Sequence, residues 1–228
     1  MMEKLTTVTL FKFKKNKFWA FNQMGILPFK IKNTEGLSFF KLMGTGGRDG
    51  FSLTPDFETY AFLGVWESEY SEKSFFNKNK FIKKYLFKAS EYRTIRMISI
   101  KSHGKWSGVN PFVEHKIKDK FKKLDVAVIT RATLRFSRLI SFWRSVPAAS
   151  KAIKLAKGII FYKGIGEWPF IQQATISIWD SFESVNNFAY NSKSHKKIVK
   201  KTRIQNWYSE DLFARFIVLS DSGFKPVI

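Results

Sequence analysis

The chain contains an internal repeat, and this feature limits its fold more than any other. Aromatic motifs occur in the same order in both halves, and each motif follows its earlier counterpart by 124, 122 and 113 residues in turn. The three pairs are Phe18-Trp19 with Phe142-Trp143, Phe39-Phe40-Lys41 with Phe161-Tyr162-Lys163, and Trp66-Glu67-Ser68 with Trp179-Asp180-Ser181. Loops of different length in the two halves account for the decrease in this offset. We therefore predict two copies of one structural unit.

Hydrophobic periodicity predicts the same element order, β-α-β-β-α-β, in both halves, which is the ferredoxin-like order. In the first half we expect strands at 6–12, 36–41, 60–67 and 92–100, helices opening near Phe18 and running over 75–89, and a glycine-rich hairpin turn at 44–50. In the second half we expect strands at 125–136, 158–163, 173–179 and 213–219, helices opening at Phe142 and running over 182–189 and 195–206, and a Gly/Pro turn at 164–169.

The predicted fold class is α+β, with tandem ferredoxin-like repeats packed as a pseudo-dimeric α/β barrel. The first repeat spans 1–101, a linker or lid spans 102–123, and the second repeat spans 124–228. Within the linker, Trp106–Phe112 carries two aromatic residues that are costly to expose. We therefore expect this stretch to fold back over the mouth of the barrel as a plug or lid.

Alternation along the strands predicts which side chains point into the barrel. Two strands of the second half each have one apolar face, which we expect to meet the helices, and one mixed face. If the mixed faces point inward, the polar lumen residues are Arg131, Thr133, Gln173 and Ser177. The large rings of Trp66 and Trp179 lie on mixed faces and need shelter, which favours a closed barrel with a cavity. The alternative is a pair of open sheets with solvated mixed faces.

Composition excludes several kinds of site. Cysteine is absent, so disulfides, zinc–thiolate sites and iron–sulfur clusters are excluded. With three histidines, a metal site built from several imidazoles is not expected. The net charge of +22 suggests nucleic acid, an anionic membrane surface or an acidic protein as partner. The basic excess is mainly lysine, whereas phosphate readers favour arginine, so we expect no specific nucleic-acid partner.

His195 is the histidine with the clearest structural setting. It opens a predicted helix, 195–206, and shares its inward stripe with Val199, while lysines cover the opposite side. An inward imidazole needs a partner. From the residues alone two interpretations stay open: a core histidine bonded to a backbone carbonyl, or a single axial ligand to haem iron in an apolar pocket. His103 and His115 fall in the predicted linker and are expected at the surface.

Six stretches in matching order resemble the spheroidene monooxygenase family of carotenoid ketolases, and the resemblance covers the chain from Thr7 to Leu219. They are Phe18–Gly25 (FWAFNQMG), Lys101–Phe112 (KSHGKWSGVNPF), Thr130–Arg135 (TRATLR), Phe142–Pro147 (FWRSVP), Gly164–Glu167 (GIGE) and Trp207–Phe216 (WYSEDLFARF). More remotely, the chain resembles dimeric α/β-barrel haem proteins such as the aldoxime dehydratases.

The resemblance implies a haem-dependent monooxygenase that hydroxylates or ketolates a hydrophobic polyene with dioxygen and electrons from ferredoxin and its reductase. Carried over by position, His195 is the ligand to the iron of haem b, with Trp179 and Val199 as cofactor-binding residues. Arg131 is suited to a haem propionate, and the four polar lumen residues are the catalytic candidates. The first repeat has Phe81 or Ile82 in place of the ligand, so one half alone is expected to carry haem.

Three other functions remain open at this point. They are a haem lyase of the aldoxime dehydratase type, a non-enzymatic haem or lipophile binder, and a nucleic-acid-binding module. The chain has no signal peptide and no run of about 20 apolar residues, so we expect a cytoplasmic protein. Its basic charge also fits peripheral contact with a membrane.

Overall fold

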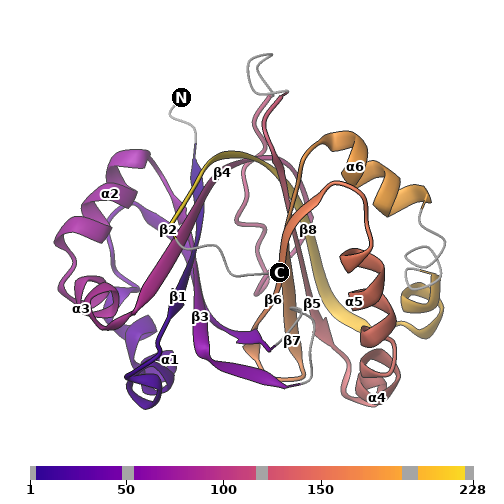
Figure 1. Cartoon of the computed structure of the whole chain (residues 1–228), viewed down its shortest axis with the longest axis horizontal. Helices are drawn as coiled ribbons and strands as arrows, with labels where there is room; N and C mark the ends of the chain where they lie inside the picture. Colours follow the sequence, from indigo (N-terminus) through magenta and orange to yellow (C-terminus); the bar gives the residue numbers. More distant parts are fainter. Residues whose placement is uncertain (1–3, 48–53, 117–122, 192–199, 224–228) are drawn as a thin grey trace.

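Eight antiparallel strands form a closed barrel flanked by helices on two sides (Figure 1). The computed structural model describes residues 4–47, 54–116, 123–191 and 200–223. The strand order around the barrel is β1-β3-β2-β6-β7-β5-β8-β4. The strands are β1 (Leu5–Lys12), β2 (Leu37–Gly46), β3 (Pro55–Trp66), β4 (Glu91–Gly104), β5 (Val126–Leu134), β6 (Ile159–Trp168), β7 (Gln172–Trp179) and β8 (Tyr208–Gly223).

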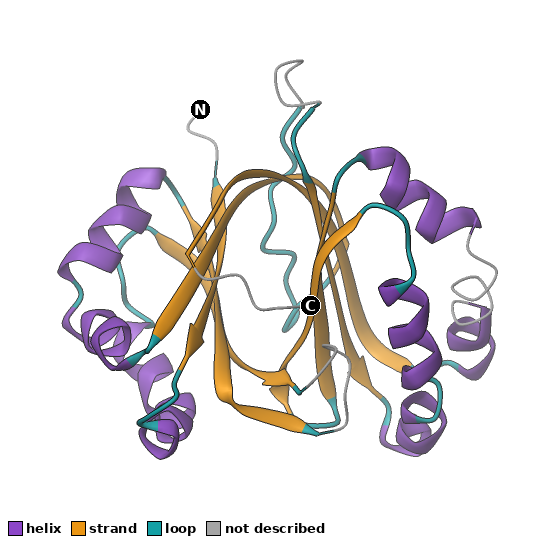
Figure 2. Ribbon diagram, in the orientation of Figure 1, coloured by secondary structure: helices purple, strands orange, loops and turns teal. Residues whose placement is uncertain are grey.

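The helices form two groups, one outside each half of the barrel, as Figure 2 shows in purple. The first group is α1 (Lys17–Ile31), α2 (Glu69–Lys78) and α3 (Lys80–Lys88). The second group is η2 (Phe136–Arg138), α4 (Leu139–Trp143), α5 (Val146–Lys154), α6 (Phe182–Asn186), the short π-helical turn η3 (Asn187–Asn191) and the helical residues 200–205. Among the described residues, no helix is both long and apolar enough to cross a membrane.

The two halves have the same topology, which confirms the predicted tandem repeat. The first half contributes β4-β1-β3-β2 and the second contributes β8-β5-β7-β6. Two seams join them. At one seam β4 pairs with β8 along most of both strands, and at the other β2 meets β6 through Gly44 with Gly166 and Thr45 with Ile165. The predicted closed, pseudo-dimeric barrel is therefore correct, and the open-sheet alternative is wrong.

Matching turns fix the strand-to-helix connections in both repeats. Gly36 and Gly158 have positive φ angles of 72° and 78°, a conformation that favours glycine. Their carbonyls accept hydrogen bonds at 2.9 Å from the backbone N–H of Glu67 and Asp180, which directly follow β3 and β7. The next residue in each case is a serine that caps the following helix. The Trp-acid-Ser motif therefore closes the same turn twice.

Among the described residues, three apolar clusters make up the core. One fills the inside of the barrel and contains residues from both halves, such as Val8, Ile129 and Ile176. The other two lie between the sheet and the helices of each repeat. Trp66 and Trp179 belong to these outer clusters, so they are sheltered by the helices and not by the lumen. The predicted inward position of these two rings is therefore wrong.

Three predicted elements differ from the structure. The predicted turn 44–50 begins as strand, because β2 runs to Gly46, and residues 48–50 lie outside the described residues. The predicted turn 164–169 is largely strand, because β6 runs on to Trp168 and the turn lies just beyond it. Glycine is needed in this part of β6, since a Cβ atom at Gly166 would lie 2.8 Å from the carbonyl oxygen of Gln172. The predicted helix 75–89 is two helices, because Asn79 ends α2 with an extended backbone and caps α3 with its side chain.

Candidate functional site

The predicted plug lies inside the barrel. The segment after β4 turns inward, and the side chains of Trp106 and Phe112 join the interior cluster with 0% and 4% exposure. Figure 2 shows this loop in teal, running between the two halves. The Trp106 ring packs edge-on against Phe39, with centroids 5.8 Å apart. The stretch therefore folds back as expected, but Trp106 and Phe112 lie inside the barrel and not over its mouth.

Two carboxylates hold the plug in place. Glu167 accepts hydrogen bonds at 2.5 Å from the Trp106 Nε1–H and from the Lys41 ammonium. Glu210 accepts backbone N–H groups of Ser107 at 3.0 Å and Gly108 at 2.7 Å. Glu210 also pairs with Arg131, whose side chain is almost completely buried. Glu210 therefore links the plug to β8, and the buried Arg131 of β5 holds Glu210 in place.

Hydrogen bonding gives Glu210 an acid-sensitive contribution to stability. Burial alone would raise the pKa of Glu210, but hydrogen bonds from Gly108, Ser107 and Arg131 outweigh it and lower the pKa below its ordinary value of 4.5. A carboxylate with a lowered folded-state pKa stabilises the fold above its ordinary pKa, and this contribution is lost as the pH falls through the folded value.

We expect Glu210→Gln to reduce the free energy of unfolding by about 2 kcal/mol at pH 7, and by much less at pH 3. Urea unfolding at both pH values measures the difference. Glu35→Gln, at an exposed position, serves as the control and should change stability little at either pH. A deficit for Glu210→Gln that stayed the same at both pH values would contradict this role.

The four predicted catalytic residues lie on opposite sides of one sheet. Arg131 follows Ile129 on the inward face of β5, and Thr133 continues that face toward the mouth of the barrel. On β7, however, Ala174, Ile176 and Ile178 point inward. Alternation therefore directs Gln173 and Ser177 toward the helices, so their predicted lumen position is wrong.

The reversal on β7 has a physical reason. The interior of the barrel is filled by both repeats and takes the apolar face of β7, whereas the helix side of the second repeat accommodates polar groups. There, Ser177 accepts a hydrogen bond from Trp179 Nε1 at 2.9 Å, and the Trp179 ring contacts Phe188 with centroids 5.1 Å apart. No single ligand can therefore reach all four predicted residues at once.

On the face that points toward the helices, the second repeat has small side chains at positions where the first repeat has large ones. Strand register makes the cross-strand row Leu42–Phe62–Thr9 equivalent to the row Gly164–Thr175–Thr130. The first row is buried, and Phe62 is completely covered. In the second row Thr130 is exposed and Thr175 is half-buried. Replacement of Leu and Phe by Gly and Thr therefore leaves space on this face.

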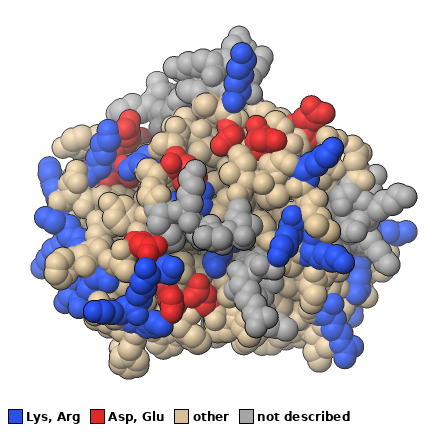
Figure 3. Space-filling view, viewed as in Figure 1, with Lys and Arg blue, Asp and Glu red and all other residues tan. Residues whose placement is uncertain are grey.

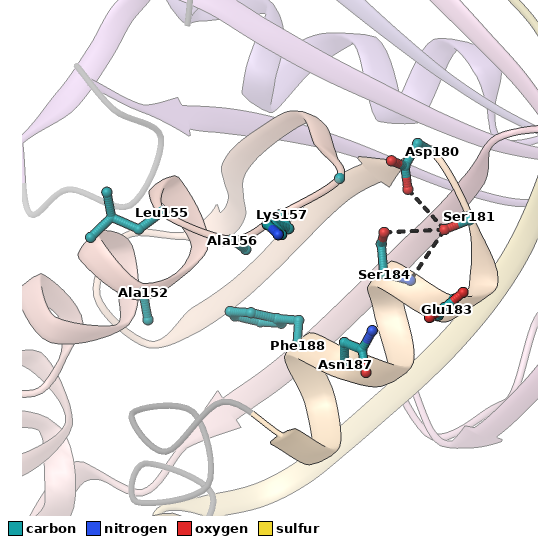
Figure 4. Close-up of a pocket in the computed structure, with 11 residues that line it drawn as sticks. Ala152, Leu155, Ala156, Lys157, Asp180, Ser181, Glu183, Ser184, Asn187 and Phe188 are labelled. Carbon is teal, nitrogen blue, oxygen red and sulfur yellow. Dashed lines mark hydrogen bonds between the residues drawn. The ribbon is translucent and has the colours of Figure 1, made fainter.

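A cavity of about 760 Å³ lies on the same side of the second repeat, between α5 and the α6–η3 segment (Figure 4). This volume is in the range typical of small-molecule sites. The wall combines apolar side chains with polar groups from the turn before α6: Ala152, Leu155, Ala156, Lys157, Gly158, Asp180, Ser181, Glu183, Ser184, Asn187 and Phe188. Hydrogen bonds from Ser184 and Ser181 lower the pKa of Asp180, so this exposed carboxylate is held ionised.

Arg215 is a polar residue on this face that the sequence interpretation missed. It lies on β8, and its guanidinium donates to Asn186 Oδ1 of α6 at 3.2 Å and lies 5.8 Å from the Phe182 ring. Its buried Nε has no hydrogen-bond partner among the described residues. Burial lowers the pKa of Arg215 from its ordinary value, with Tyr190 acting in the opposite direction. Strand alternation could have identified Arg215, because its neighbours Ala214 and Phe216 are apolar and face inward, which directs Arg215 to the helix side.

His195 and Val199, the predicted ligand and its neighbour, lie outside the described residues. The described chain stops at Asn191, the end of η3, and resumes as helix at Lys200. The cavity wall formed by α6 and η3 is therefore the segment that immediately precedes the predicted ligand in sequence. Of the other histidines, His103 is exposed on β4, where its ring stacks on Phe213 with centroids 5.3 Å apart.

The chain is similar over nearly its whole length to curated spheroidene monooxygenases. It is 32% identical to the one from Cereibacter sphaeroides, covering 96% of this chain and 68% of that protein. The corresponding protein of Rhodobacter capsulatus is 27% identical, over 96% of this chain and 92% of that protein. No protein-family model matches the chain.

Among solved structures, an aldoxime dehydratase shares the fold with a TM-score of 0.61, at 9% identity, over 95% of this chain and 82% of the other. At that identity the likeness concerns the fold alone. The sequence relationship is of another kind, since it extends from one repeat through the plug into the other. The chain therefore belongs to the spheroidene monooxygenase family.

Proposed function

We propose that this protein is a monooxygenase that hydroxylates or ketolates a carotenoid-like polyene, with haem b bound on the helix side of the second repeat. The observation that carries the proposal is the 32% identity to a spheroidene monooxygenase across 96% of the chain. In such a reaction one oxygen atom of dioxygen is inserted into a C–H bond to give C–OH, and the other leaves as water. The step consumes two electrons and two protons. A second round at the same carbon gives a hydrate that loses water to form a ketone.

The described residues on the helix side suit haem b in two respects, which are space and a nearby cation. Haem needs apolar walls, a cation near its carboxylates and an axial ligand. The row Gly164–Thr175–Thr130 leaves room where the first repeat is filled, and the Nε–H of Arg215 has no partner within the described part of the chain. His195, which lies outside the described residues, is the proposed ligand to the iron, and Trp179 and Val199 are proposed as cofactor-binding residues from the family resemblance. When bound, the haem would supply the redox-active iron at which dioxygen is activated.

The chain's own residues would position groups around that site. The hydroxyls of Thr130 and Thr175 lie 2.7 Å apart, so one of the pair is able to donate a hydrogen bond outward from the sheet. Gln173 and Ser177 lie on the same face and remain candidates. Arg131 is already paired with Glu210 on the lumen side, so we assign it to the plug and propose Arg215 as the cation that would pair with the haem carboxylates.

The electrons would come from ferredoxin and its reductase. A net charge of +22 supports this choice, because long-range attraction steers an acidic electron donor toward a basic surface.

The test combines haem uptake and oxygen incorporation. Hemin titration of the purified protein should produce a Soret band that is lost in His195→Ala and kept in His115→Ala. With a ferredoxin system, an acyclic carotenoid and ¹⁸O₂, the first product should gain one labelled oxygen atom. A parent protein that takes up no hemin would contradict the cofactor assignment. Turnover without label from dioxygen would contradict the monooxygenase.

A further inference from the structure

Helix α1 has apolar side chains on both of its faces, although one face is exposed. Ala20, Leu27 and Ile31 pack into the core of the first repeat. On the opposite side, Phe18 and Phe29 are 78% and 72% exposed, with Phe21 and Ile26 between them. A helix that is apolar all round normally has both faces covered. Something outside this chain is therefore expected to cover the exposed face.

Neighbouring elements extend this apolar patch. The Phe57 ring of β3 contacts Phe21, with centroids 6.2 Å apart. Phe87 near the end of α3 is 88% exposed, and the next residue, Lys88, lies against the start of α1: its carbonyl accepts a hydrogen bond from Asn16, and its ammonium lies 5.3 Å from the Trp19 ring. We call the exposed side chains of Phe18, Phe21, Ile26, Phe29, Phe57 and Phe87 the α1 patch.

Lysines surround the α1 patch. Lys14, Lys15 and Lys17 precede α1, Lys30 and Lys32 lie at its end, and Lys83 and Lys84 lie on α3, all of them exposed. Of these, Lys14 pairs with Glu91 and Lys17 with Glu58. Figure 3 shows basic side chains gathered at the lower left, where Figure 1 places α1 and α3.

We propose that the α1 patch docks the protein on an anionic lipid bilayer. Aromatic side chains ringed by lysines are the pattern of helices that lie in the membrane interface, with the rings between the acyl chains and the ammonium groups at the headgroups. An anionic bilayer supplies an apolar phase and negative charge at one surface, whereas a second copy of this chain would bring like charge against these lysines, because the chain is itself strongly basic. The surface belongs to the first repeat, away from the site on the second.

Vesicle co-sedimentation tests the proposal without substrate or cofactor, so its result does not depend on the proposed enzymatic function. The protein should bind vesicles of phosphatidylcholine with about 30% phosphatidylserine, and bind pure phosphatidylcholine at least about tenfold more weakly. Phe18→Ser with Phe29→Ser should lower the partition coefficient at least about tenfold. Phe136→Ser, which alters a 73% exposed ring in the second repeat, should not.

Charge reversal provides a second arm. Lys15→Glu with Lys30→Glu should weaken binding roughly fivefold per lysine, whereas Lys101→Glu with Lys105→Glu, which changes the net charge equally, should have a much smaller effect. Equal binding of both vesicle types, or full binding by the double Phe variant, would overturn the proposal. So would a parent dimer that the double Phe variant converts to a monomer while vesicle binding is unchanged.

Discussion

Thr175→Phe should lower hemin affinity at least about 100-fold while leaving the free energy of unfolding unchanged or higher. The substitution copies the first repeat, where Phe62 occupies the equivalent position and is completely buried. A phenyl ring at position 175 would project from the sheet into the space that Gly164 and Thr130 leave open. Hemin titration and urea unfolding of the same preparation measure both quantities.

Two further variants make this result specific. Thr175→Ser keeps the hydroxyl that bonds Thr130 and adds no bulk, so it should change hemin affinity by no more than about threefold. The reverse exchange, Phe62→Thr, should cost about 3–5 kcal/mol, because the Phe62 ring packs against Phe75 at 5.7 Å and Trp66 at 6.3 Å. Parent-like hemin binding by Thr175→Phe would place the cofactor elsewhere, even if the protein binds haem.

Trp106→Ala should lower the free energy of unfolding by about 4 kcal/mol and Tm by roughly 10 °C. The ring is completely buried among residues of both repeats, and its N–H is bonded to Glu167 at 2.5 Å. Removing it leaves a cavity inside the barrel and a carboxylate with one partner fewer. Calorimetry and urea unfolding at pH 7 measure the loss.

Graded variants separate the packing of Trp106 from its hydrogen bond. Trp106→Phe retains most of the buried area and should cost less, since the main loss is then the bond to Glu167. Val109→Ala alters a half-exposed side chain in the same segment and should change stability by less than about 0.5 kcal/mol. A cost below about 1 kcal/mol for Trp106→Ala would mean that the plug adds little to the barrel.

The repeat was readable from sequence because its anchors are local. Each Trp-acid-Ser motif ends a strand, closes a turn onto Gly36 or Gly158 and caps a helix, so a few neighbouring residues carry the whole signal. The barrel followed from two such units. The plug was also predictable, because Trp106 is too large and apolar for an exposed linker.

The sequence did not predict which face of each strand points into the barrel. In this barrel each sheet has buried side chains on both faces, one toward the opposite repeat and one toward helices, so alternation identifies two faces without saying which is inside. The rule that polar residues line the lumen held for Arg131 on β5 and failed for Ser177 on β7. Pairing decides the matter: Arg131 lies opposite Ala174, so the polar faces of these neighbours point in opposite directions.

The two seams have a consequence for stoichiometry. A homodimer built from one ferredoxin-like unit would place the same residue at both equivalent positions, so it would fill both helix-side spaces or neither. Here one polypeptide forms both halves, and position 62 is Phe while position 175 is Thr. Because the two halves belong to one chain, their equivalent positions can differ. One half can then be fully packed while the other can form a binding site. If the proposed haem site is correct, a chain built this way would hold one ligand where its symmetric counterpart would hold two.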